Sequence, residues 1–312
     1  MYDVHTHFIP PLMSQWLYEN RSVVNAAWVR KSLGKAPFLT INGNWEFELK
    51  EAFTDSDLYL TGQRKAGIAH SLVSPIPQLF LYEMAPDVTE EAARIYNDGL
   101  ADWSAAHRDE VSALATVPMN DPDRAARELE RAMDLGLRGA IVASSWGGRT
   151  LGEEAFTPFW EVANTREAIV FIHPLLCTDS RLKKHMMPNL IGVPWETTVC
   201  ATELLLSGLV FRYPKVKLLL AHGGGYFPYQ LGRLEKGYET WGAVSAGLPE
   251  SPTEAARRFW YDTVLWNDAA LQYLIDIAGE DRIVQGTDAP FDLCQRPPAA
   301  VPSSGYHALM EV

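Results

Sequence analysis

Short β-rich runs alternate with longer helical segments along most of the 312-residue chain, and this alternation constrains the fold more than any other feature. It is the pattern of repeated βα units around a parallel sheet. Eight parallel strands predict a closed (β/α)8 barrel, the TIM-barrel architecture of the α/β class. The eight candidate strands span residues 2–5, 67–73, 112–117, 139–143, 168–172, 216–221, 259–264 and 282–285.

Three of the intervening segments have helical patterns. Residues 89–107 begin at Thr89, a residue type suited to a helix cap, and residues 121–135 carry Ala, Leu and Met at helical spacing. Residues 195–211 form an apolar amphipathic run. We expect these helices in the outer ring of the barrel. Catalytic residues of such barrels sit at the C-terminal ends of strands, so polar residues there carry the most information.

The stretch from residue 8 to residue 66 is far longer than an ordinary βα loop of ~2–6 residues. It contains the tryptophans Trp16, Trp28 and Trp45 and a turn-prone Asn-Gly-Asn sequence at residues 42–44. A disordered linker is poor in aromatic residues. We therefore expect an inserted subdomain or lid over the barrel mouth, within a single domain that spans residues 1–312.

The C-terminus is atypically short for such a barrel. The Pro-rich sequence of residues 296–302 follows the last strand, and the rest lacks the apolar periodicity of an eighth outer helix. Three alternatives are open: a neighbouring subunit covers that edge of the barrel, the edge stays partly open, or the sequence is shortened at this end.

Composition excludes several classes of partner. The chain has 27 basic and 39 acidic residues, and its formal charge of −12 would repel nucleic acid and anionic membranes. It has no long uninterrupted apolar run and no signal-like N-terminus. Its three cysteines, Cys177, Cys200 and Cys294, lack metal-type spacing, and an odd number fits a reducing compartment. We expect a cytoplasmic protein that binds a small molecule.

Polar residues with metal-ligand chemistry follow four of the candidate strands. Strand side chains alternate between faces, so His5 and His7 point the same way at the end of the first strand. That pair alone is equally compatible with two hydrogen-bonded histidines. His173 ends the fifth strand, His222 follows the sixth and precedes three glycines, and Asp288 follows the eighth.

Three histidines and an aspartate, with water in a further position, match the ligands of a catalytic zinc ion. We favour four of these five residues as ligands, namely His5, His7, His173 and Asp288. That choice leaves His222 as an unbound acid and base beside the metal water. For any one of these residues, the alternative is a hydrogen-bonded side chain at a strand end.

Six stretches resemble, in family order, the amidohydrolase superfamily and its branch typified by aminocarboxymuconate-semialdehyde decarboxylase. They cover residues 5–10, 115–119, 171–174, 192–198, 221–228 and 286–291. The resemblance implies one divalent metal, usually zinc with manganese as the alternative. It places the metal on the four residues named above and the proton transfer on His222.

The resemblance also implies a substrate site. Arg233 matches a family arginine that grips a substrate carboxylate, often across a dimer interface, so a homodimer is expected. The alternative is a surface salt bridge on the following helix. Trp195 and Phe291 follow site motifs and either line an aromatic substrate pocket or simply pack. Glu196 and Asp262 are candidates to orient a ligand histidine.

One departure from the family pattern leaves the substrate open. The family decarboxylase has an arginine after a phenylalanine in the first long loop, whereas Glu48 follows Phe47 within residues 45–48 here. An anion in place of a cation would weaken binding of a dicarboxylate.

Three functions follow from these observations. The leading hypothesis is a metal-dependent, non-oxidative decarboxylase of an aromatic or muconate-type carboxylic acid. The alternative enzyme is a metal-dependent hydrolase of an amide, a lactone or a carbon–carbon bond in a ring-cleavage product. A metal-binding barrel without turnover is the non-enzymatic alternative. Release of carbon dioxide from a panel of such acids indicates the decarboxylase, cleavage of a ring-fission product or an amide without that release indicates the hydrolase, and bound metal without turnover indicates the non-enzymatic protein.

Overall fold

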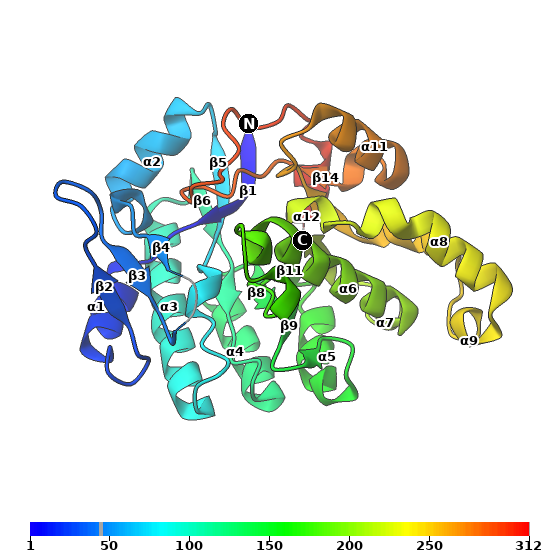
Figure 1. The fold of residues 1–312 in the computed structure, drawn as a ribbon, viewed down its shortest axis with the longest axis horizontal. Coiled ribbons are helices and arrows are strands. Elements are labelled where there is room, and N and C mark those ends of the chain that lie inside the picture. Colours follow the sequence, from blue (N-terminus) through cyan, green and yellow to red (C-terminus); the bar gives the residue numbers. More distant parts are fainter. Residues whose placement is uncertain (44–45, 312) are drawn as a thin grey trace. The chain divides into compact units, whose positions relative to one another are not determined.

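The computed structural model describes residues 1–43 and 46–311 (Figure 1). The chain divides into two compact units. Unit 1 contains Met1–Ile141 and Gly286–Ala299. Unit 2 contains Val142–Gln285 and Ala300–Val312. Both units combine parallel strands with helices, and the strand β8 (Gly139–Ala143) contains the first boundary between them.

Unit 1 holds the first half of the predicted strand series. The strand β1 (Tyr2–His7) pairs in parallel with β5 (His70–Ser74), which pairs in parallel with β6 (Val111–Ala113). The strand β7 (Ala115–Thr116) pairs in parallel with β8. The helices of this unit are α1 (Pro11–Glu19), α2 (Ser56–Lys65), α3 (Pro86–Ala106) and α4 (Pro122–Asp134).

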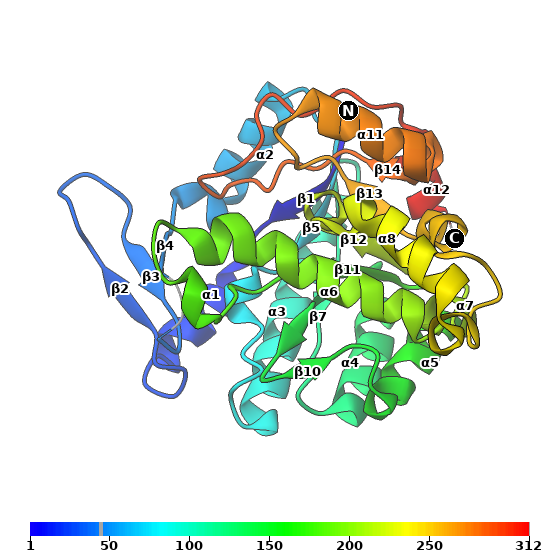
Figure 2. The same ribbon diagram turned by 45° about the vertical axis from the view of Figure 1, so that its right-hand side comes forward.

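The described residues of the segment from 8 to 66 are folded. Besides α1 it holds an antiparallel sheet of β2 (Ala27–Val29), β3 (Phe38–Thr40) and β4 (Phe47–Glu48), which Figure 2 shows side by side. Its last part is α2, where Gln63 Nε2 donates a hydrogen bond to Asp3 Oδ2 on β1 at 2.9 Å. The helix α2 is thus bonded to β1, and the chain continues from it into β5. Trp45 and Asn44 of the predicted lid lie outside the described residues.

Unit 2 holds the second half of the series. Four strands pair in parallel, in the order β11 (Ile169–His173), β12 (Lys217–Leu220), β13 (Trp260–Asp262) and β14 (Ile283–Val284). A short antiparallel hairpin consists of β9 (Ser145–Trp146) and β10 (Arg149–Thr150). The helices are α5 (Thr157–Thr165), α6 (Val193–Leu206), α7 (Leu209–Arg212), α8 (Phe227–Thr240), α9 (Gly242–Ser245), α10 (Pro252–Ala255), α11 (Asp268–Ala278) and α12 (Ser304–Met310).

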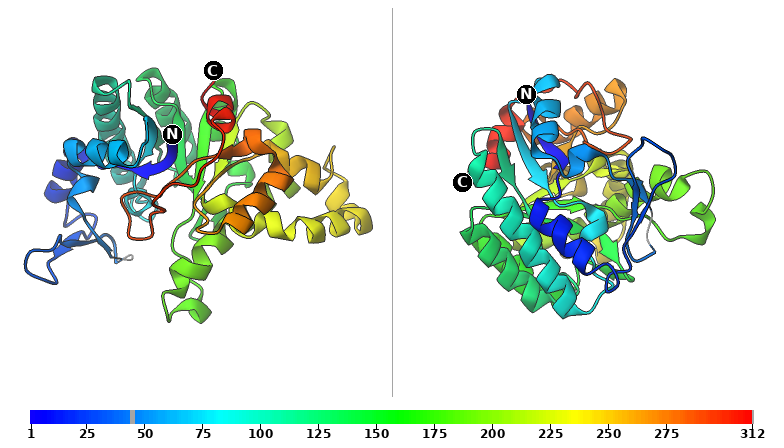
Figure 3. Two further views of the ribbon diagram at one scale, coloured as in Figure 1. Left: turned by 90° about the horizontal axis from the view of Figure 1, so that it is seen from above. Right: turned by 90° about the vertical axis from the view of Figure 1, so that its left-hand side faces the viewer.

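The expectation that the chain ends without an outer helix is wrong. The helix α12 follows the Pro-rich segment and appears in red near the C-terminus in Figure 3. Its Tyr306 and Leu309 are buried, and Lys217 Nζ donates a hydrogen bond to the carbonyl of Leu309 at 2.9 Å. Seven residues are fewer than the window in which helical periodicity can be recognised, so the sequence pattern missed this helix.

Among the residues that the structure describes, no helix is long and apolar enough to span a bilayer.

Candidate metal centre

The strand β1 carries two of the candidate metal ligands, His5 and His7. His5 and His7 are both fully buried, and alternation along the strand puts them on one face. The Nδ1 atom of His7 lies 3.1 Å from the carbonyl oxygen of Pro75. A carbonyl can only accept, so Nδ1 of His7 carries the proton and its Nε2 has a lone pair. Burial also lowers the pKa of His7, which favours the neutral, metal-binding form.

Asp288 reaches these imidazoles because its segment is bonded to β1. The backbone amide of Asp288 donates to the carbonyl of His5 at 2.7 Å, and that of Thr287 donates to the same carbonyl at 3.2 Å. Asp288 has a φ of +61°, a left-handed conformation that is uncommon for a residue other than glycine. Such outliers persist where the surrounding structure holds them, and they are concentrated at functional sites.

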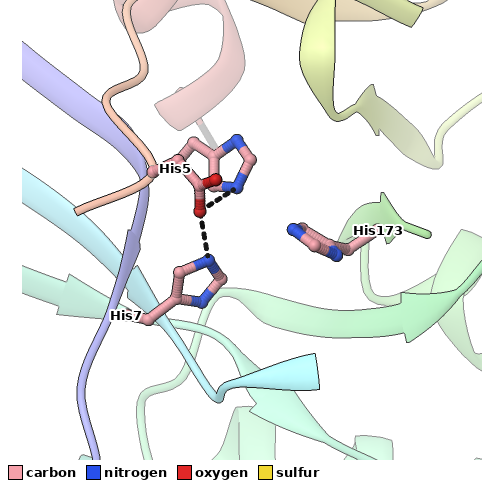
Figure 4. A group of neighbouring side chains, drawn as sticks. His5, His7 and His173 are labelled. Atoms are coloured by element: carbon pink, nitrogen blue, oxygen red, sulfur yellow. Dashed lines mark ion pairs between the residues drawn. The ribbon is translucent and has the colours of Figure 1, made fainter. Parts of the chain in front are cut away.

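The carboxylate and the two imidazoles form one tight group of donor atoms. Oδ1 of Asp288 lies 3.3 Å from Nε2 of His5 and 3.3 Å from Nε2 of His7 (Figure 4, dashed lines). Ligand atoms held about 2.1 Å from one tetrahedral ion lie about 3.4 Å apart. Two imidazole nitrogens and a carboxylate oxygen are also a donor set that divalent transition metals accept. These residues therefore fit a divalent metal ion.

A buried aspartate that the sequence reasoning missed supports this group. Asp3 is fully buried on β1 and accepts hydrogen bonds from Thr287 Oγ1 at 2.6 Å and from the amide of His5 at 3.2 Å. It thereby joins the strand of His5 to the segment of Asp288. Burial raises the pKa of its carboxyl to about 6, although these hydrogen bonds oppose the rise. Strand alternation alone could not have identified Asp3, because the pairing register of β1 shifts between Asp3 and Thr6.

Unit 2 brings His173 and His222 together. His173 ends β11, is 8% exposed, and its Nδ1 donates to the carbonyl of Pro174 at 2.9 Å, which leaves Nε2 for a ligand (Figure 4). His222 follows β12, and its ring centroid lies 5.3 Å from that of His173. Both histidines thus lie where the strand pattern put them, at the C-terminal ends of neighbouring parallel strands.

Glu196 and Asp262 are the two residues that we expected to orient a ligand histidine, and both accept hydrogen bonds from other groups. Glu196 on α6 accepts a hydrogen bond from Ser145 Oγ at 2.6 Å. Asp262, the last residue of β13, accepts from the backbone amides of His222 and Gly223 at 3.0 and 2.9 Å. Neither of these contacts is with the ring of a ligand histidine. Asp262 instead bonds the turn that carries His222.

The predicted carboxylate-binding arginine is exposed on α8. Within residues 1–43 and 46–311, Arg233 forms no ion pair, so the alternative of a surface salt bridge is not observed. Trp195 is half-buried at the start of α6, and the guanidinium carbon of Arg181 lies 5.3 Å from its ring centroid.

Phe291 packs directly against a candidate ligand. Its ring centroid lies 5.2 Å from that of His7, 4.8 Å from that of Phe53 and 5.5 Å from that of Phe47. Phe47 belongs to β4, so this aromatic cluster connects the small antiparallel sheet to the imidazole of His7. Glu48, which follows Phe47 on β4, is half-buried.

Comparisons with known proteins point to one family. A family model described as amidohydrolase matches residues 2–303. The 2-amino-3-carboxymuconate-6-semialdehyde decarboxylase of Dictyostelium discoideum is 29% identical over 93% of this chain and 82% of its own length. The 6-methylsalicylic acid decarboxylase of Penicillium expansum is 31% identical over 92% of this chain and 84% of its own length.

A solved structure matches the whole chain. The 5-carboxyvanillate decarboxylase of Novosphingobium aromaticivorans, complexed with manganese and 4-hydroxy-3-methoxy-5-nitrobenzoic acid, superposes with a TM-score of 0.79. It is 20% identical and covers 100% of this chain and 90% of its own. The chain therefore belongs to the amidohydrolase family, and its fold is the α/β barrel of the (β/α)8 class that the strand pattern predicts. Its named relatives are decarboxylases.

Proposed function

We propose that this protein is a metal-dependent, non-oxidative decarboxylase of an aromatic or muconate-type carboxylic acid. The observation that carries the proposal is the buried group of His5, His7 and Asp288, with both imidazole nitrogens 3.3 Å from one carboxylate oxygen. It occurs in a chain that resembles named decarboxylases over 92% and 93% of its length.

His173 is the proposed fourth ligand. Its Nε2 carries a lone pair because Nδ1 donates to the carbonyl of Pro174. The proposed ion is zinc, with manganese as the alternative because that ion is bound in the solved relative. When bound, a divalent ion supplies a Lewis acid that polarises an oxygen of the acid substrate.

The chain's own residues then handle the proton and the carboxylate. His222 delivers a proton to the carbon that bears the carboxylate. The bond between that carbon and the carboxylate then breaks, and its electron pair returns to the unsaturated system as carbon dioxide leaves. The balance is one acid anion and one proton in, one neutral product and one carbon dioxide out. No redox cofactor is required.

Arg233 is the proposed carboxylate clamp, contributed across the interface of a homodimer. Its exposure on α8 and the absence of an ion pair within the described residues leave the guanidinium accessible to a partner. A planar guanidinium binds a carboxylate through two parallel hydrogen bonds. Trp195 and Phe291 are proposed as aromatic walls of the substrate site.

The substrate is proposed to carry a single carboxylate, with no second carboxylate beside the small sheet. Glu48 is half-buried on β4, and a second carboxylate of a substrate beside it would meet a like charge. Aromatic monocarboxylic acids avoid this repulsion.

A cytoplasmic location is proposed because Cys177, Cys200 and Cys294 are all free cysteines, as is usual in a reducing compartment. Fractionation of the native cell tests this location.

The test is release of carbon dioxide from the metal-loaded protein. The panel contains hydroxybenzoic, aminobenzoic and muconate-semialdehyde acids, and we expect release from at least one aromatic member. Absence of carbon dioxide throughout, together with cleavage of an amide, a lactone or a ring-fission product, would identify a hydrolase instead. Bound metal with no turnover of either kind would identify a non-catalytic barrel.

A further inference from the structure

The turn that carries His222 has an unusual backbone. Four successive residues, His222 to Gly225, have positive φ, with values of 54°, 58°, 77° and 63°. Glycine adopts this region without steric cost, but histidine does not. Something in the surrounding structure therefore has to hold His222 in this conformation.

Asp262 supplies hydrogen bonds that hold it. This carboxylate is fully buried at the end of β13, beside β12. Its Oδ2 accepts from the amide of His222 at 3.0 Å, and its Oδ1 accepts from the amides of Gly223 and Val264 at 2.9 and 3.0 Å. Both oxygens are used, and two of the three donors are the first two amides of the turn.

The far end of the turn is fixed by α6. Thr198 Oγ1 accepts from the amide of Tyr226 at 2.7 Å and donates to the carbonyl of Pro194 at 2.7 Å. A Cβ atom at Gly225 would lie 2.1 Å from that same carbonyl oxygen. The turn is therefore bonded at its start by Asp262 and at its end by Thr198.

We infer that Asp262 is a positioning residue for proton transfer. By bonding the amides of His222 and Gly223, it fixes the backbone of His222, so that the imidazole stays 5.3 Å from the ring of His173. Its influence on turnover rests on the proposed function, in which His222 moves the proton. Its influence on the turn does not depend on that function.

The test compares Asp262→Asn with Tyr261→Phe in the metal-loaded protein. An asparagine has one acceptor atom, so it cannot accept on both sides as the carboxylate does. Tyr261→Phe is the matched control on the same strand, because it removes a buried hydrogen bond to the carbonyl of Ala256 and keeps the ring beside Gly224. Both variants lose buried hydrogen bonding, but only Asp262→Asn changes the bonds to the turn.

Two readouts are expected to change in Asp262→Asn and not in Tyr261→Phe. Residue-resolved hydrogen exchange of the His222 and Gly223 amides should accelerate by ~10-fold or more. With a substrate from the panel, kcat should fall by ~10- to 100-fold while KM and the bound metal stay within ~2-fold of the wild type.

The outcomes separate the two claims. Unchanged exchange in Asp262→Asn, or equal losses of kcat in both variants, overturns the positioning role. A wild-type protein that decarboxylates nothing overturns the proposed function, while the exchange result still decides whether Asp262 holds the turn. If Asp262→Asn does not fold, Thr198→Val, which removes the acceptor of the Tyr226 amide, must lower kcat at unchanged KM. A wild-type kcat in that variant also overturns the inference.

Discussion

At the scale of single residues, the grouping of His5, His7 and Asp288 in unit 1 was predictable, whereas the carboxylates that support the two candidate sites were not. His5, His7 and Asp288 follow from strand ends and from residue types that bind metals. Asp3 and Asp262 do not, because their roles depend on which backbone amides the folded turns bring to them. A carboxylate that accepts hydrogen bonds from backbone amides is hard to recognise in one sequence, because its donors are not marked by any particular residue type.

Replacing His222 tests whether this residue transfers a proton or binds the metal. We expect His222→Ala to keep its metal and to lose ~10²- to 10⁴-fold in kcat, the usual contribution of a general acid or base. Metal content by elemental analysis and carbon dioxide release are measured on the same sample. The control is His185→Asn, at an exposed position with a φ of +58° that asparagine tolerates. Loss of metal from His222→Ala would mean that this residue is a ligand.

At the scale of elements, the positions of the strands were predicted more accurately than the breaks within the predicted strands and helices. The run predicted at residues 139–143 is the strand β8. The run at residues 112–117, however, is two strands, because β6 pairs with β5 and β7 pairs with β8. Such a change of partner is a tertiary effect that local sequence does not record.

The helix predicted at residues 195–211 is likewise two helices. The chain leaves α6 after Leu206 and begins α7 at Leu209, with Gly208 between them at a φ of +74°. Apolar residues continue through this break, so hydrophobic periodicity alone could not locate it. The single glycine was the available signal, since glycine adopts positive φ readily at helix ends.

A substitution at Gly225 tests whether the turn after β12 tolerates a side chain. Gly225→Ala would place a Cβ atom 2.1 Å from the carbonyl oxygen of Pro194, at a φ of +63°. We expect a loss of about 2–4 kcal/mol in the free energy of unfolding, from the steric overlap and the strained φ together. Urea denaturation measures it.

The matched control for that substitution is on the neighbouring helix. Gly232 lies in α8, and an added Cβ there would meet nothing within 4 Å. Gly232→Ala should therefore leave stability unchanged or raise it by about 0.5–1 kcal/mol, the usual preference for alanine inside a helix. Equal effects of the two alanines would show that the turn is not tightly packed.

At the scale of the whole molecule, the fold class was predictable because eight strand-like runs recur in order along the chain. The segment after β1 and the C-terminal residues were harder to predict. The segment after β1 is long enough to be recognised as an addition, but its three short strands pair with one another, and their register depends on packing. The helix α12 has seven residues and follows a Pro-rich stretch, so its pattern was too short to be recognised.

Mixing two inactive variants tests the proposed homodimer. If Arg233 acts on the partner's site, random pairing of Arg233→Ala with His222→Ala subunits creates one complete site in each mixed dimer. Half of the dimers are mixed, so activity should recover to about one quarter of the wild-type value. Carbon dioxide release is measured after the subunits are dissociated and reassociated together. Failure to recover any activity from the two inactive variants would place Arg233 in the site of its own subunit, and full activity of Arg233→Ala alone would place it outside the site.

The metal content of the purified protein tests the central claim most directly. Elemental analysis of the wild type, before and after incubation with zinc or manganese, should give about one equivalent of metal per chain, and Asp288→Ala should lose both metal and carbon dioxide release. A wild-type protein with fewer than ~0.2 equivalents, unchanged by either ion, would contradict the metal centre built from His5, His7 and Asp288.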